Sequence, residues 1–238
     1  MPNYPYSYYM IPLAELWLAV TICQLLHLGI MALIAHRFGI PIRKFSYGVG
    51  PTLLKRGVWQ IRILPISGYV TLKDSRAEQL DPADCSDAFN HQSVWKQVFL
   101  PLAGGGSVVL LAVLLLGEHG WESFLQGFDQ IFEGAISPFS TAQLYLEEFV
   151  SYSRNNSFPF VLALVASKFG ALNFLPFVPF CGGQVVMNLV RWGRPGTEWE
   201  APSGRSALFI SMLILAGWLL AFLYFVVQHS GDLYGSVP

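Results

Sequence analysis

One apolar stretch near the start of the chain, from about residue 11 to 38, carries side chains that could do chemistry. His27 lies in its middle, and Cys23 and Met31 stand four residues before and after it. In a helix this spacing places all three on one face, within about 80° of arc over two turns. An ionisable residue is costly at membrane depth, which makes His27 a candidate functional residue. The alternative is a neutral histidine that hydrogen-bonds to a neighbouring helix.

The composition predicts an integral membrane protein rather than a large water-soluble one. The 238 residues are 53% apolar and 12% charged, with a mean hydropathy of +0.47, whereas soluble domains carry about 25% charged residues. Several apolar runs reach membrane length. The formal net charge is −1, which suggests no nucleic-acid partner. The three cysteines lie far apart without a CxxC pair, so no disulfide framework is implied.

The sequence predicts a single α-helical, polytopic membrane domain over residues 1–238 with about four transmembrane spans. The spans are expected at about 11–38, 94–116, 158–190 and 207–227. The third span is broken at 173–184, because its prolines and glycines cannot continue one helix. Irregular backbone at membrane depth must face protein or a cavity. Alternating apolar and polar residues at about 58–72 predict a small β-hairpin or sheet.

Basic residues predict the orientation in the membrane. Nine of the fourteen Lys and Arg lie between Arg37 and Lys96, and three more precede the last span. The segment after the second span holds only Arg154. The positive-inside rule therefore places residues 39–96 in the cytoplasm and both termini outside. Residues 118–157 carry apolar side chains at helical intervals, which favours short amphipathic helices on the membrane surface.

Several short motifs follow one another between about residues 12 and 190. They are His27-Leu-Gly-Ile-Met31, Ala35-His-Arg-Phe-Gly-Ile40, Phe45-Ser-Tyr-Gly-Val-Gly-Pro51, Gly68-Tyr69-Val70, Asn173-Phe-Leu-Pro176 and Phe180-Cys-Gly-Gly183. In this order and spacing they resemble the site-2 protease family of intramembrane zinc metalloproteases, peptidase family M50. The family motifs concerned are HExxH with its A-R-x-x-G-I tail, F-S-x-G-x-G-P, G-Y-V and N-x-x-P-x-x-x-L-D-G-G. The resemblance implies the family's membrane core, with the break near Cys181 packed against the first span.

The sequence departs from the family at the catalytic positions. Active members bind zinc through both histidines of HExxH and the aspartate of LDGG, and the glutamate is the general base. Only His27 is retained. Leu28 stands where the base belongs, Met31 where the second histidine belongs, and Cys181 where the aspartate belongs. Leucine cannot accept a proton, and losing a general base costs about 10²- to 10⁴-fold in rate. No catalytic residue is therefore assigned.

These features favour a catalytically inactive, site-2-protease-like protein. It would bind a membrane segment or a partner protein, such as another membrane protease. The alternative is an intramembrane zinc metalloendopeptidase with an altered active site, acting in regulated proteolysis. The family match nominates four residues for contact with a bound segment: Asn173, Pro176, Gly68 and Tyr69. The alternative for each of them is that it only maintains the fold.

The resemblance implies zinc, but the zinc ligands are degenerate here. The candidate metal ligands are His27, Cys181, Met31 and Cys23, since the family match brings Cys181 to the face of the other three. Thiolate and thioether donors without hard oxygen ligands favour Cu(I), or less well zinc, and disfavour calcium and magnesium. Cys23 and Met31 lie about 12 Å apart along the helix axis, so one ion could reach only one of them. The alternative is that these side chains simply fill a buried helix face.

Overall fold

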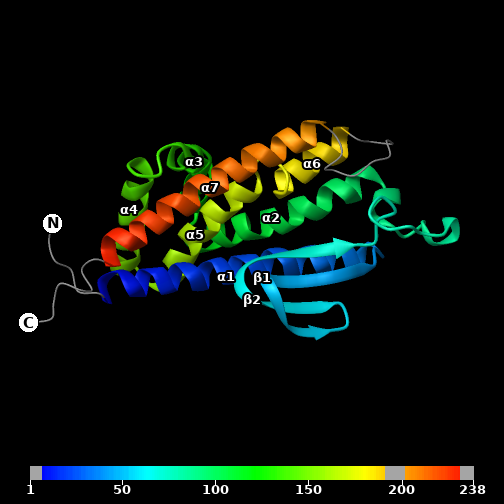
Figure 1. Cartoon of the computed structure of the whole chain (residues 1–238), viewed down its shortest axis with the longest axis horizontal. Coiled ribbons are helices and arrows are strands. Elements are labelled where there is room, and N and C mark those ends of the chain that lie inside the picture. Colours follow the sequence, from blue (N-terminus) through cyan, green and yellow to red (C-terminus); the bar gives the residue numbers. More distant parts are fainter. Residues whose placement is uncertain (1–6, 191–201, 231–238) are drawn as a thin grey trace, which may run out of the picture.

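The computed structural model describes residues 7–190 and 202–230, which form a bundle of helices with a β-hairpin along one side (Figure 1). The elements in chain order are α1 Ser7–Arg37, β1 Ile42–Arg56, β2 Trp59–Leu72, two 3-10 turns at Pro82–Asp84 and Phe89–His91, α2 Val94–Leu116, α3 Glu118–Ile136, α4 Thr141–Asn155, α5 Phe158–Asn173, α6 Cys181–Val190 and α7 Pro202–Ser230. Among the described residues, α1, α2 and α7 are long and apolar enough to cross a membrane, while α5 and α6 are shorter apolar helices.

The predicted spans correspond closely to these helices. The span at 94–116 coincides with α2, the span at 11–38 with α1, and the span at 207–227 with the middle of α7. The region 118–157 forms α3 and α4, as the helical spacing of its apolar residues predicted. The prediction of a mainly helical membrane protein is confirmed, and α5 with α6 occupies the place of the broken third span.

The break between α5 and α6 is shorter than predicted. Helix α6 begins at Cys181, so only residues 174–180 are non-helical and the two glycines lie in the first turn of α6. A Cβ atom at Gly182 would stand 2.4 Å from the Phe174 carbonyl oxygen, and one at Gly183 would stand 2.2 Å from Phe177 C. The glycines are therefore explained by packing of α6 onto the break and not by interruption of a helix.

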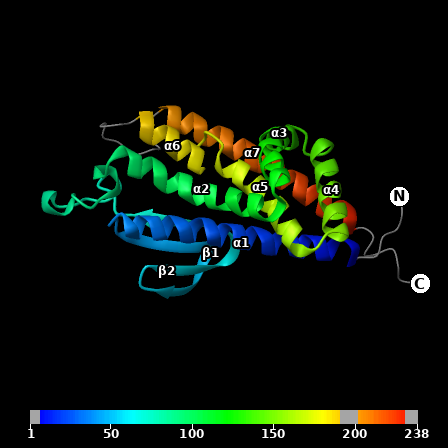
Figure 2. The same ribbon diagram turned by 180° about the vertical axis from the view of Figure 1, so that it is seen from behind.

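Helix α1 ends in a Schellman motif that turns the chain sharply into β1. Gly39 has φ +72°, its N–H donates to the His36 carbonyl, and the Ile40 N–H donates to the Ala35 carbonyl at 2.9 Å. A glycine is favoured at this position because the left-handed conformation penalises a Cβ atom. The hairpin is consequently directed back along α1 (Figures 1 and 2).

The hairpin is larger than the predicted segment 58–72. Its first strand, β1, was not predicted, and the turn lies at Gly57–Val58. The hairpin also folds back on itself, because Phe45 pairs with Val70 on one side and with Trp59 on the other. Gly48 and Gly50, with φ of +97° and +88°, permit this bend in β1. Residues 68–72 pair with β1 along one edge only, so their outer edge has no strand partner within the described ranges.

Three glycines spaced seven residues apart let α3 cross three other helices at short range. Each faces a different neighbour, and the pairs are Gly120 with Ala112 of α2, Gly127 with Ala171 of α5, and Gly134 with Trp218 of α7. Phe124 and Ile131 lie on the same helix and join a core cluster with Val109 and Ile214. Helix α3 is thus an integral part of the bundle.

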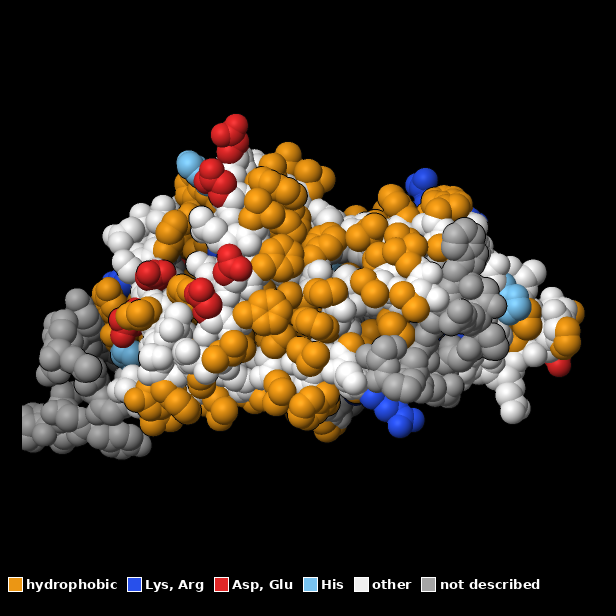
Figure 3. All heavy atoms as spheres, turned by 90° about the horizontal axis from the view of Figure 1, so that it is seen from above, with side chains coloured by type: hydrophobic (Ala, Val, Ile, Leu, Met, Phe, Trp, Pro, Cys, Tyr) orange, Lys and Arg blue, Asp and Glu red, His pale blue; other side chains and the backbone are white. Residues whose placement is uncertain are grey.

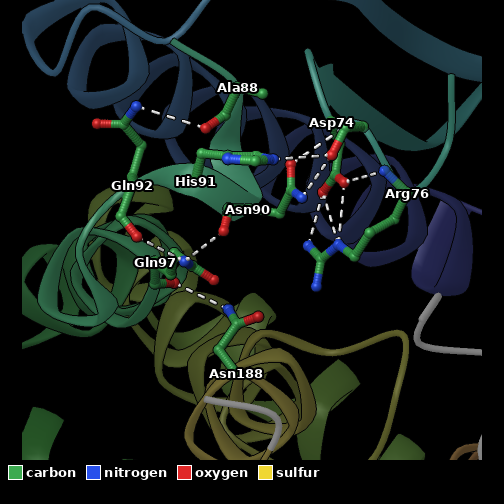
Figure 4. A network of polar contacts seen from close by, with 9 residues as sticks. Asp74, Arg76, Ala88, Asn90, His91, Gln92, Gln97 and Asn188 are labelled. Atoms are coloured by element: carbon green, nitrogen blue, oxygen red, sulfur yellow. Dashed lines mark hydrogen bonds and ion pairs between the residues drawn. The ribbon is translucent and has the colours of Figure 1, made fainter. Parts of the chain in front are cut away.

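Acidic side chains gather at one end of the bundle, and a network of polar contacts lies at the other (Figures 3 and 4). At one end the rings of Tyr9 on α1 and His229 on α7 lie 4.1 Å apart between centroids. On the face seen in Figure 3, acidic side chains gather toward this end and hydrophobic side chains cover the middle. At the other end, a polar network joins residues 74–92 to α2 and α6 (Figure 4). There Gln97 donates to the backbone of Asn90 and Gln92, and Asn188 donates to the Gln97 carbonyl.

Candidate functional site

His27 on α1 and Cys181 at the start of α6 meet beside α2, which packs against both helices. The His27 Nε2 atom lies 3.7 Å from the Cys181 Sγ atom, although the residues are 154 positions apart in the chain. Both side chains are buried, with 6% and 3% of their surface exposed. His27 Nδ1 makes no hydrogen bond within the part of the chain that the structure describes. The predicted approach of the segment 173–184 to α1 is therefore present in the structure, through Cys181 at the start of α6.

Glycines of α2 allow the close packing around His27. A Cβ atom at Gly104 would stand 2.6 Å from Met31 Cγ and 3.0 Å from His27 Cε1. At Gly105 the nearest side chain is the ring of Phe174, which follows α5 at the start of the break. Small residues let helix backbones approach each other in membranes. The glycine run of α2 thus lets its backbone approach both His27 and Met31 on α1 and Phe174 at the start of the break.

The backbone of the break is itself anchored by the last helix. Ser211 on α7 is fully buried, and its hydroxyl donates to the Val178 carbonyl at 2.6 Å. An unpaired carbonyl at membrane depth would be costly. Ser211 was not among the predicted site residues, and a lone serine within a long apolar run is a weak sequence signal.

Leu28 fills the space between α1 and the hairpin. Its side chain is 2% exposed and packs with Ala32 and Phe45. One of its methyl groups lies 2.6 Å from the position that a Cβ atom would take at Gly68. One turn earlier on α1, Gln24 Nε2 donates to the Gly68 carbonyl at 3.4 Å. Sequence reasoning overlooked Gln24, whose signal was an amide within an apolar run, four residues before Leu28.

The candidate metal ligands separate into two clusters. Met31 and Cys181 share one buried cluster with Ala35 and Leu100. Cys23 belongs to another, which it forms with Val108, Ala112 and other small apolar residues. The structure therefore groups Met31 with His27 and Cys181, and it places Cys23 in apolar packing.

The candidate binding residues are distributed over two places. Asn173 donates to the Phe169 carbonyl of its own helix at 2.8 Å, and Pro176 lies in the break. Gly68 rests on α1, and the neighbouring Tyr69 is 41% exposed.

Two cations surround Tyr69. Arg62 donates to its hydroxyl oxygen at 3.3 Å, and the hydrogen bond from Lys44 is the main cause that lowers the pKa of Tyr69. The exposed Tyr69 ring thus lies on β2 with the positive charges of Lys44 and Arg62 beside it.

The donor set does not fit a zinc site of the ordinary kind. Catalytic zinc takes three protein ligands and structural zinc takes four, drawn from Cys, His, Asp and Glu. No cluster of three such side chains occurs within residues 7–190 and 202–230. His27 and Cys181 supply two ligands, and Met31 offers only a thioether, which suits softer ions.

The sequence is similar to a peptidase family and to several named proteases. The sequence model of Peptidase family M50 matches residues 16–216. Proteins named "Putative zinc metalloprotease" from Xylella fastidiosa (strain Temecula1) and Vibrio cholerae are 33% identical over 99 residues and 29% over 116 residues. These matches cover 40% and 46% of this chain, and 21% and 25% of the relatives. The Regulator of sigma E protease of Haemophilus influenzae is 26% identical over 175 residues, which is 66% of this chain and 39% of that protein. The chain thus matches well under half the length of these relatives.

Proposed function

Because the chain belongs to peptidase family M50, the family of the site-2 proteases, we propose that it keeps the membrane core of that family and binds without hydrolysing. Its ligand would be a membrane segment or a partner protein, such as another membrane protease. The names of the matched relatives describe zinc metalloproteases and a regulator protease. Proteolysis is an activity of those proteins, and its loss here is the substance of the proposal.

Leu28 is the single observation that carries this proposal. It stands where the family motif has the glutamate that activates zinc-bound water, and it is buried against the hairpin. A hydrocarbon side chain cannot take a proton from water, which removes about 10²- to 10⁴-fold in rate. Three residues later, Met31 stands where the family motif has its second histidine. The general base and one of the family's zinc ligands are therefore both missing from the same site.

The binding function rests on the hairpin beside α1. The outer edge of residues 68–72 carries main-chain groups that a partner strand could pair with. Tyr69 is exposed at this edge. The break at residues 174–180 offers a second surface of non-helical backbone, with Pro176 inside it and Asn173 immediately before it. An unwound membrane segment laid along β2 would lie next to α1, against which β2 packs.

The orientation of the chain is part of the proposal. The hairpin and residues 191–205 are rich in basic residues, and the positive-inside rule places them in the cytoplasm. Helices α3 and α4, which carry most of their charge as Asp and Glu, would then lie outside with both termini. The partner segment would be engaged from the cytoplasmic half of the membrane.

An altered-site peptidase is the competing function. It is favoured by the His27 and Cys181 pair, since an imidazole and a thiolate are both zinc ligands and their donor atoms lie 3.7 Å apart. Such an enzyme would need its water activated without the family's glutamate. The two functions differ in one observable, the chelator-sensitive release of peptide fragments.

Reconstitution into liposomes tests the proposal. Cys85 is the cysteine outside the buried core, so it can carry a fluorescent donor for energy transfer to a labelled transmembrane peptide with helix-breaking residues. The proposal predicts saturable energy transfer and an intact peptide, with or without added zinc, and weaker transfer to a polyleucine helix that resists unwinding. Absence of binding would refute the binding function. Cleavage that stops with a chelator and in His27→Ala would establish the altered-site peptidase instead.

A further inference from the structure

His27, Met31 and Cys181 bring one nitrogen and two sulfur donors together inside the bundle. We propose that these three side chains form a site for a soft monovalent ion of the Cu(I) class, in the place where the family's zinc would be bound. The site differs from the family's zinc site because Met31 and Cys181 supply sulfur donors. The proposal does not depend on the loss of proteolysis, because metal binding is measured without any peptide.

The distance between His27 and Cys181 suits two ligands of one ion. An ion bonded to nitrogen at about 2.0 Å and to sulfur at about 2.3 Å separates the donors by about 3.5–3.7 Å, when the angle at the metal is about 110–120°. The observed separation of Nε2 and Sγ is 3.7 Å. Both side chains can therefore bind one ion with little movement of α1 or α6.

Met31 is the third donor, and α2 fixes its place. Its Cγ atom and the His27 ring both lie against Gly104, at 2.6 and 3.0 Å from the position of a Cβ atom there. Met31 also shares a buried cluster with Cys181. The thioether can thus complete a three-coordinate site. Cys23 packs in a different cluster and is not a ligand.

The chemistry of the donors decides which ion is preferred. Thiolate and thioether sulfur select Cu(I), and imidazole accepts it as well. Carboxylates, which would favour calcium, magnesium or a catalytic zinc, form no cluster with His27 in the described parts of the chain. The Cys181 thiol gives up its proton to solvent when it binds the ion, so binding releases one proton. Burial of all three side chains also protects the bound ion from water.

Titration of the purified full-length protein with Cu(I), against a competing chelator and under reducing conditions, tests the proposal. We expect one ion per chain, with affinity lowered more than about 100-fold in Cys181→Ser and in His27→Ala, since even indirect supports of metal ligands are worth about 10- to 100-fold. Met31→Leu should lower the affinity by a smaller factor. Cys23→Ser is the matched control on the same helix and should leave the affinity unchanged.

Adjacent glycines supply a second test that keeps all the ligands. Gly104→Ala places a methyl group against Met31 and His27, whereas at Gly106 nothing lies within 4 Å of the new carbon. Gly104→Ala should therefore weaken Cu(I) binding, and Gly106→Ala should not. The proposal is overturned if Cys181→Ser binds Cu(I) as tightly as wild type. It is equally overturned if wild type binds zinc through His27 and fails to bind Cu(I).

Discussion

Leu28 on α1 and Gly68 on β2 are in direct contact, and the contact leaves no room for a side chain at position 68. A Cβ atom there would meet a Leu28 methyl group at 2.6 Å and the Ser46 carbonyl oxygen at 2.7 Å. The glycine thus holds the hairpin against the membrane helix, on the turn of α1 that carries His27. Leu28, which the proposed function places at the family's general-base position, thus packs two elements together.

The Leu28–Gly68 contact predicts a specific pattern of stabilities. Gly68→Ala should lower the free energy of unfolding by about 1–3 kcal/mol, as overpacking of a filled site usually does. Leu28→Ala in the same chain should recover part of this loss, so the two changes should be less than additive. Thermal unfolding in detergent measures all four forms.

Gly29→Ala is the control for this cycle, because nothing lies within 4 Å of its added carbon. It should leave stability unchanged or raise it by up to about 1 kcal/mol through helix propensity. Strictly additive effects of Gly68→Ala and Leu28→Ala would mean that the contact is absent.

The meeting of α1 and α6 predicts a crosslink. Met31 and Cys181 share a buried cluster, so Met31→Cys, with Cys23 and Cys85 changed to serine, should join to Cys181 under a short thiol crosslinker. The product is an internally bridged chain that runs faster on a non-reducing gel. Leu33→Cys is the control, because Leu33 lies on the exposed side of α1 and should give no bridge. Equal yields from the two positions would contradict the close approach of Met31 to Cys181.

Residues 73–93, which follow the hairpin, should lose protection from hydrogen exchange in acid. Lys73 Nζ contacts Asp87 Oδ1 at 2.6 Å, and the lysine side chain is buried while the aspartate is partly exposed. The hydrogen bond from Lys73 is the main cause that lowers the pKa of Asp87. A carboxyl group whose folded pKa is lowered stabilises the fold above its unfolded pKa, about 3.9, and this contribution disappears as the pH falls through the folded pKa.

Hydrogen exchange of residues 73–93 measures this effect. Wild type should stay protected from pH 7 to 5 and lose protection below about pH 4, whereas Asp87→Asn should be open at neutral pH because it leaves a buried ammonium group. Glu78→Gln breaks the more exposed pair with Arg43 and should change little. Protection of Asp87→Asn equal to that of wild type would show that the pair does not hold this segment.

The sequence was sufficient to predict the long helices and the place of the break. Apolar runs of membrane length and the prolines after Asn173 are local signals, and the helices α1, α2 and α7 follow them within a few residues. The family motifs also predicted that Cys181 meets His27. Helical spacing could not choose between Cys23 and Met31, because the choice depends on which turn of α1 lies level with Cys181.

The hairpin could not be predicted correctly from local pattern alone. Strand β1 contains Gly48, Gly50 and Pro51, which interrupt alternation and conceal a strand. These residues have a role only once the chain folds back and Phe45 pairs on both sides. The glycines of α6 were misjudged for a related reason: their purpose is a contact with Phe174 and Phe177, and such a contact leaves no local pattern.

The most direct test of the central claim compares cleavage of one transmembrane peptide by two forms of the protein in the same liposomes. The forms are wild type and the variant carrying Leu28→Glu, Met31→His and Cys181→Asp. We expect no fragments from wild type, with or without zinc. From the variant we expect zinc binding and chelator-sensitive cleavage, because base and ligands are then restored on a retained backbone. Fragments released by wild type, and abolished by His27→Ala, would contradict the claim that this family member binds without hydrolysing.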